Sequence, residues 1–95
     1  MDAICVLLKE LSNVVDFSLE DNQNQYLLQL KKNDDLIVEI TIPKEVCEWY
    51  VSIFRKEQKV FTDWLDYYGD SEENLIKDMC KDLKDFIIGI SNRKI

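Results

Sequence analysis

The cysteines are the first candidates in this chain for reactive or metal-binding residues. Cys5, Cys47 and Cys80 lie far apart in the 95-residue sequence, without the CxxC spacing of metal and redox sites. Each has apolar neighbours, so we predict buried, reduced thiols, with a nucleophilic cysteine or a three-thiolate metal site as the alternative. The chain has no histidine, which removes the usual general base and the commonest metal ligand. We therefore expect neither an enzyme nor a bound metal or cofactor.

Carboxylates are the second possible source of chemistry, since the chain has 19 Asp and Glu against 12 Lys and Arg. Paired carboxylates can cleave glycosidic bonds by acid–base catalysis. The two adjacent pairs, Glu20-Asp21 and Asp34-Asp35, fall where the sequence predicts turns. Aspartate favours turns because its side chain hydrogen-bonds the nearby backbone. We interpret both pairs as turn residues.

The acids are not spread evenly along the chain. Between Val60 and Ile76 there are five acidic residues and no basic ones, interleaved with Trp64 and two tyrosines. Aromatic residues often carry the binding energy of protein interfaces. We predict a partner-binding patch made of Asp63, Asp66, Tyr67, Tyr68, Asp70, Glu72 and Glu73. The alternative is structural: acids near residues 70–73 favour a helix N-terminus, and Trp64 is then a core residue.

The net charge of −7 bears on the partner. A chain of this charge repels a phosphate backbone, which argues against direct nucleic-acid binding and favours a basic protein partner. No apolar run reaches the roughly 20 residues that span a bilayer, so we expect no membrane association. The short N-terminal apolar run follows an acid and has no cleavage pattern, and the cysteine count is odd. Both features favour a cytoplasmic protein.

The elements that position these residues follow from hydrophobic periodicity. A helical stripe occupies the first dozen residues, and alternation of period two begins at Val14, with Val15, Phe17 and Leu19 facing inward. Further strands are predicted at Gln25–Lys31, from Leu36 to an end at Pro43, and at Cys47–Arg55.

The last third of the chain holds one ambiguous element and one clear one. A turn at residues 56–59 precedes Val60–Tyr68, which we predict as a strand, with a short helix as the alternative. Asp70 and Glu73 have capping-box spacing at the start of a helix running from about Ser71 to about Ser91. The sequence thus predicts a single α+β domain over residues 1–95: an antiparallel meander of four to five strands flanked by an N-terminal and a C-terminal helix.

Two stretches resemble a known family: residues 48–54, EWYVSIF, and residues 60–69, VFTDWLDYYG. Together they are similar to a pattern of small bacterial immunity proteins that accompany polymorphic toxins, including contact-dependent growth inhibition systems. The resemblance implies a cytoplasmic antidote that binds one cognate toxin domain, often a basic nuclease, and blocks its active site or substrate surface. The alternative function is an acidic nucleic-acid mimic or adaptor that binds a basic protein.

Overall fold

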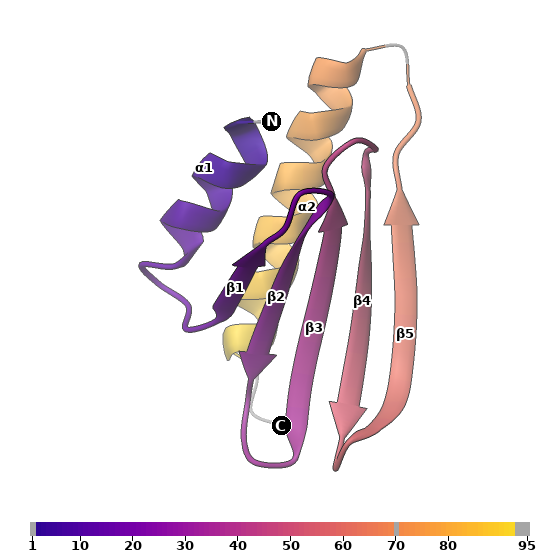
Figure 1. Ribbon diagram of the computed structural model, residues 1–95. Coiled ribbons are helices and arrows are strands. Elements are labelled where there is room, and N and C mark those ends of the chain that lie inside the picture. Colours follow the sequence, from indigo (N-terminus) through magenta and orange to yellow (C-terminus); the bar gives the residue numbers. More distant parts are fainter. Residues whose placement is uncertain (1, 70, 93–95) are drawn as a thin grey trace. The chain divides into compact units, whose positions relative to one another are not determined.

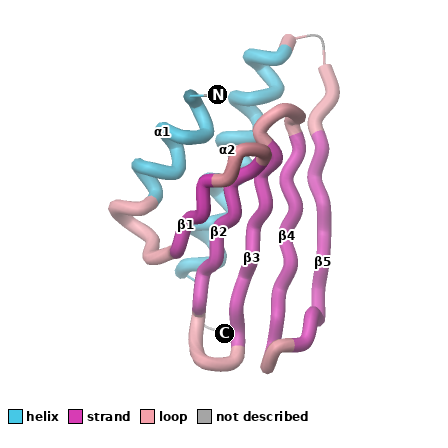
Figure 2. Tube along the Cα trace, viewed as in Figure 1, coloured by secondary structure: helices cyan, strands magenta, loops and turns pink. Residues whose placement is uncertain are grey.

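A computed structural model of the chain describes residues 2–69 and 71–92. The chain forms a five-stranded antiparallel sheet with one helix before it and one after it, so the predicted α+β class is confirmed (Figures 1 and 2). In chain order the elements are α1 (Asp2–Leu11), β1 (Ser18–Asp21), β2 (Gln25–Lys31), β3 (Leu36–Pro43), β4 (Glu48–Arg55), β5 (Gln58–Asp66) and α2 (Glu72–Asn92).

The strands form a meander, because their order in the sheet is their order in the sequence, β1-β2-β3-β4-β5. β2 has the predicted bounds, and β3 ends at Pro43 as predicted. The side chains predicted to face inward from β3 are all buried, with exposed fractions of 4% or less: Leu36, Val38, Ile40 and Ile42. Alternate residues therefore give this sheet one buried face and one open face.

Two of the turns between strands have a clear physical basis. Before β3, the side-chain oxygen of Asn33 accepts hydrogen bonds from the amides of Asp35 and Leu36, at 2.9 and 3.0 Å. Between β4 and β5, the turn has only two residues, Lys56 and Glu57, both with positive φ (51° and 68°). Positive φ at both central positions is the signature of a type I′ hairpin turn. The predicted four-residue turn is therefore too long.

The short turn explains the position of β5. Strand, rather than helix, is confirmed for this segment, but β5 runs from Gln58 to Asp66 instead of from Val60 to Tyr68. Two residues of the expected turn are part of the ladder, in which Arg55 pairs with Gln58. A register shift at Ile53/Phe54 leaves Val60 without a direct partner on β4.

The first strand differs most from expectation. β1 begins at Ser18, not at Val14, because the amides of Val14 and Val15 bond the Leu11 carbonyl at 3.0 and 2.8 Å and close the end of α1. Val15 is buried although it lies in the loop after α1, whereas Leu19, predicted to face inward, is 45% exposed.

The contacts divide the chain into two compact units. One is the sheet unit, residues 17–66, and the other is the helical unit, which joins residues 2–16 to the segment from Tyr67 onward. In the helical unit α1 and α2 contact each other, and both bury a stripe at helical spacing. The stripe of α2 comprises Met79, Leu83, Ile87 and Ile90.

The start of α2 is capped by Ser71. Its hydroxyl accepts a hydrogen bond from the Asn74 amide at 3.4 Å, and its carbonyl accepts one from the Leu75 amide at 3.1 Å. The predicted cap, Asp70, lies outside the described residues. Within the described ranges, neither helix is long and apolar enough to cross a membrane.

Candidate functional site

The residues predicted to bind a partner fall in both units. Asp63 and Asp66 belong to β5 in the sheet unit. Tyr67, Tyr68, Glu72 and Glu73 belong to the helical unit, and Asp70 lies outside the described residues.

In the helical unit the two tyrosines have different surroundings. The Tyr67 hydroxyl donates a hydrogen bond to Oδ2 of Asp82 on α2 at 2.8 Å, and its ring is half-buried. This bond holds the segment after β5 against α2, so Tyr67 has a structural role within the unit. Tyr68, by contrast, is 84% exposed. Glu72 and Glu73 occupy the exposed first turn of α2, where a negative charge also stabilises the helix.

In the sheet unit, the pairing of β4 with β5 brings together residues that are distant in sequence. Tyr50 lies directly opposite Trp64, and Glu48 lies directly opposite Asp66. Cross-strand partners share a face, and these four are on the open face, since Trp49 between them is only 2% exposed. We call Glu48, Tyr50, Trp64 and Asp66 the open-face cluster.

Both aromatic rings of the open-face cluster are accessible. Trp64 is 57% exposed and Tyr50 is 39% exposed. The sequence left open whether Trp64 is a core residue, and its exposure excludes that role. The core tryptophan is Trp49, on the opposite face of β4.

The carboxylates of the cluster act on the Tyr50 phenol. The Tyr50 hydroxyl donates a hydrogen bond to Oε2 of Glu48. This bond raises the pKa of Tyr50 above its ordinary value of 10.0, and desolvation and the negative charges of Glu48 and Asp66 raise it further.

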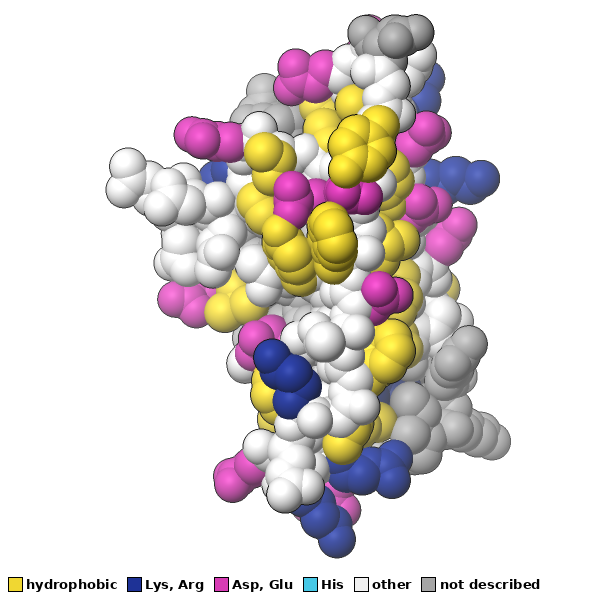
Figure 3. Space-filling view, turned by 90° about the vertical axis from the view of Figure 1, so that its right-hand side faces the viewer, with side chains coloured by type: hydrophobic (Ala, Val, Ile, Leu, Met, Phe, Trp, Pro, Cys, Tyr) yellow, Lys and Arg dark blue, Asp and Glu magenta, His cyan; other side chains and the backbone are white. Residues whose placement is uncertain are grey.

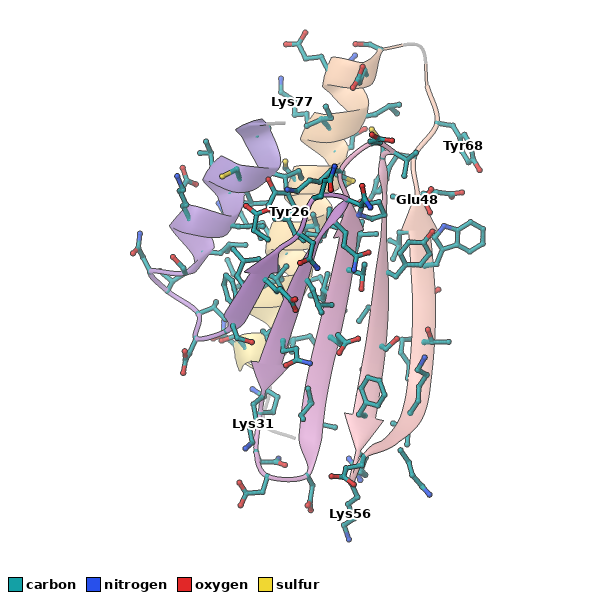
Figure 4. The ribbon with its side chains drawn as sticks, viewed as in Figure 1. Tyr26, Lys31, Glu48, Lys56, Tyr68 and Lys77 are labelled. Atoms are coloured by element: carbon teal, nitrogen blue, oxygen red, sulfur yellow. The ribbon has the colours of Figure 1, made fainter. Side chains whose placement is uncertain are left out.

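Charge changes sign along the β4–β5 hairpin. At the turn end lies Lys56, and Lys59 places its ammonium nitrogen 5.7 Å from the centre of the Phe54 ring. Glu48 lies at the opposite end of β4 from Lys56, as Figure 4 shows. Viewed onto the β5 edge, acidic and hydrophobic side chains interleave, and basic side chains gather toward the turn (Figure 3).

This arrangement can bind a cationic side chain. A guanidinium or ammonium group stacks on an exposed indole or phenol ring and pairs with a neighbouring carboxylate. Glu48 and Tyr50 were not among the predicted site residues, because the prediction grouped residues by closeness in sequence. The signal that finds them is the strand register, which sets them opposite Asp66 and Trp64. Asp63 is opposite Val51, on the other face, although its own side chain is exposed.

The three cysteines are reduced and form no disulfide with one another. Each is half-buried, rather than buried as predicted. Cys80 lines a groove in the helical unit together with Ala3 and Ile76, and burial raises the pKa of its thiol. A raised pKa keeps the thiol protonated near neutral pH, which disfavours a nucleophilic role. Among the described residues, no group of three or more Cys, Asp or Glu is arranged to hold a metal ion.

Comparison with known proteins gave no match: no protein-family model, curated protein or solved structure matches this chain.

Proposed function

We propose that the chain is a toxin-neutralising immunity protein that binds a cognate basic toxin domain and blocks its active site. The observation that supports this most directly is the open-face cluster, an exposed aromatic pair beside two opposed carboxylates. Exposed aromatics beside acids suit an interface with a basic protein, and they add little to the stability of the chain that carries them.

The residues that carry the family resemblance support the same proposal. Stretches 48–54 and 60–69 contain most of β4 and β5, and the open-face cluster lies entirely within them. The similarity to immunity proteins is thus concentrated on the hairpin that carries the exposed aromatic and acidic side chains.

Charge and aromatic residues have different tasks in this proposal. Carboxylates act over about a Debye length, ~8–10 Å at ordinary salt, and mainly accelerate encounter. Buried aromatic anchors act after contact and mainly slow dissociation. Acids outside the cluster, namely Asp63, Glu72 and Glu73, are expected to assist encounter.

The test is rescue of growth. Cells that express a candidate basic toxin domain alone should stop growing, and co-expression of the wild-type chain should restore growth when that domain is the cognate one. Trp64→Ala combined with Glu48→Gln and Asp66→Asn should abolish rescue while the variant stays folded. The matched control replaces Glu20 and Glu39, acids elsewhere on the sheet, by glutamine. It removes the same charge and should still rescue.

Binding rates separate this function from its alternative. With the purified toxin domain, the amide variants should associate more slowly and with a weaker salt dependence, and Trp64→Ala should dissociate faster. A nucleic-acid mimic would lose affinity in proportion to the charge removed, wherever on the surface it was removed. Equal effects of the cluster variants and the Glu20/Glu39 control would therefore contradict the proposal and favour the mimic.

A further inference from the structure

The outer edge of β5 is the longest unpaired strand edge in the described part of the chain. β5 has nine residues, and within the described ranges it pairs only with β4. A strand at the end of a sheet presents a row of backbone donors and acceptors that another chain can pair with. This edge is therefore a template for an added strand.

One of these backbone groups already has a substitute partner. The Trp64 amide donates a hydrogen bond to Oδ1 of Asp63 at 2.8 Å. The acceptor in a sheet ladder is a carbonyl of the neighbouring strand. The Asp63 carboxylate thus takes the place of the carbonyl acceptor that a strand added to the β5 edge would offer to the Trp64 amide. Rotation of this one exposed side chain returns the amide to the edge.

The side chains along the edge indicate the chemistry of the occupant. Val60, Phe61 and Trp64 are exposed by 57%, 48% and 57%. Two acids, Asp63 and Asp66, stand on opposite faces of β5 against one base, Lys59. A strand that alternates apolar and cationic residues complements this edge on both faces.

A second copy of the chain is a poorer occupant. Each copy brings a net charge of −7, so two copies repel each other as wholes, whereas a basic partner is attracted.

We propose that the free edge of β5 accepts an extended basic segment of the partner protein as an added strand, with Asp63 releasing the Trp64 amide to it. This inference rests on the proposed function, which supplies the basic partner, and adds the mode of binding.

The probe is a blocked nonapeptide of alternating valine and lysine, titrated into the isotope-labelled chain and followed by nuclear magnetic resonance and calorimetry. Bound peptide should slow hydrogen exchange of the Trp64 amide. An association through side chains alone would leave that amide unchanged.

Two matched pairs of variants isolate the backbone contribution. Trp64→Pro and Trp64→Ala both remove the indole, but only proline removes the amide hydrogen, and edge strands tolerate proline where the amide faces outward. We expect Trp64→Pro to bind the peptide about tenfold more weakly than Trp64→Ala.

Asp63→Ala and Asp63→Asn lose the same charge, but asparagine still caps the amide. Asp63→Ala should therefore bind more tightly than Asp63→Asn, a comparison that does not depend on the folding of the proline variant.

Three outcomes would overturn the inference. The first is equal peptide binding within both pairs. The second is no binding at about 1 mM peptide. The third is concentration-dependent protection of the Trp64 amide without peptide, which would make a second copy the occupant. The proposed function fails separately, if the open-face cluster variants still rescue growth.

Discussion

The two edges of the sheet are built in opposite ways. β1 has four residues, all exposed, and two of them are acidic. β5 has nine residues and exposes three large hydrophobic side chains, Val60, Phe61 and Trp64. Short, charged edge strands resist pairing with other chains, whereas long apolar edges invite it. The β1 edge is too short to pair well with another chain, while β5 is protected mainly by its two acids, Asp63 and Asp66, of which Asp63 also caps the Trp64 amide.

The faces of the sheet also differ: one holds the side chains that stabilise the sheet, and the other holds side chains that are available to a partner. On β4 and β5 the separation is sharp, because successive residues face opposite sides. Trp49 is 2% exposed, and Trp64, opposite the next residue of β4, is 57% exposed.

The largest expected effect tests this separation. Trp49→Ala should lower the free energy of unfolding by about 3–5 kcal/mol, because it empties a large volume in the buried face. Trp64→Ala should cost less than about 1 kcal/mol, because most of its ring is already in water. Urea unfolding of both variants measures the two losses. Equal losses would mean that the β5 aromatics serve the fold, and the separation between the two faces of the sheet would disappear.

The next effect concerns the turn that leads into β5. Lys56 and Glu57 both hold positive φ, a conformation that costs most residues about 1–2 kcal/mol and that asparagine and glycine adopt readily. Replacing the pair by Asn-Gly should raise the free energy of unfolding by about 1–2 kcal/mol. Glu57→Ala is the control, since alanine retains the steric cost and should give no gain. A loss of stability in the Asn-Gly variant would show that the turn is not a strained I′ hairpin.

The sequence predicts the buried strands well and the exposed ones poorly, for a physical reason. Alternation marks β2 and β3 because burial of one face selects apolar residues at every second position. β1 has no buried side chain, and the predicted alternation of Val15, Phe17 and Leu19 covers two residues of the loop after α1 and only one residue of the strand, Leu19. At the β4–β5 turn, Lys-Glu adopts a conformation for which neither residue type is a signal.

The candidate site was predicted only in part, because closeness in sequence differs from closeness in space. The acidic segment of the sequence contains Trp64 and Asp66, two members of the open-face cluster. It could not include Glu48 and Tyr50, which the β4–β5 register places opposite them. Predicting that register requires the turn length and the irregularity at Ile53/Phe54, and neither has a signature in the sequence.

A smaller effect tests the cap on the β5 edge. Hydrogen exchange of the Trp64 amide should be about fivefold faster in Asp63→Ala than in Asp63→Asn, because only asparagine keeps an acceptor for that amide. The two variants have the same charge, so the comparison is free of electrostatic effects on exchange. Exchange at the same rate in both would mean that the carboxylate does not protect the edge, and β5 would then lack the cap that distinguishes it from β1.

The smallest effect is the ionisation of Tyr50, beside the β5 edge. The hydrogen bond to Glu48 is the main cause of its raised pKa, so Glu48→Gln should lower this pKa toward 10.0, and Asp66→Asn should lower it less. Because the folded chain favours the protonated phenol, the ionisation equilibrium of Tyr50 makes a small contribution to the stability of the fold. This contribution is present below pH 10 and is lost as pH rises through the folded pKa. Ultraviolet absorbance of phenolate measures the titration, and the difference between the wild-type chain and Tyr50→Phe assigns it. Glu39→Gln makes the same charge change on the open face and should leave the Tyr50 pKa nearly unchanged. If Glu48→Gln has no larger effect than Glu39→Gln, the carboxylate and phenol are not bonded, and Glu48 is then free to meet a cation without first releasing Tyr50.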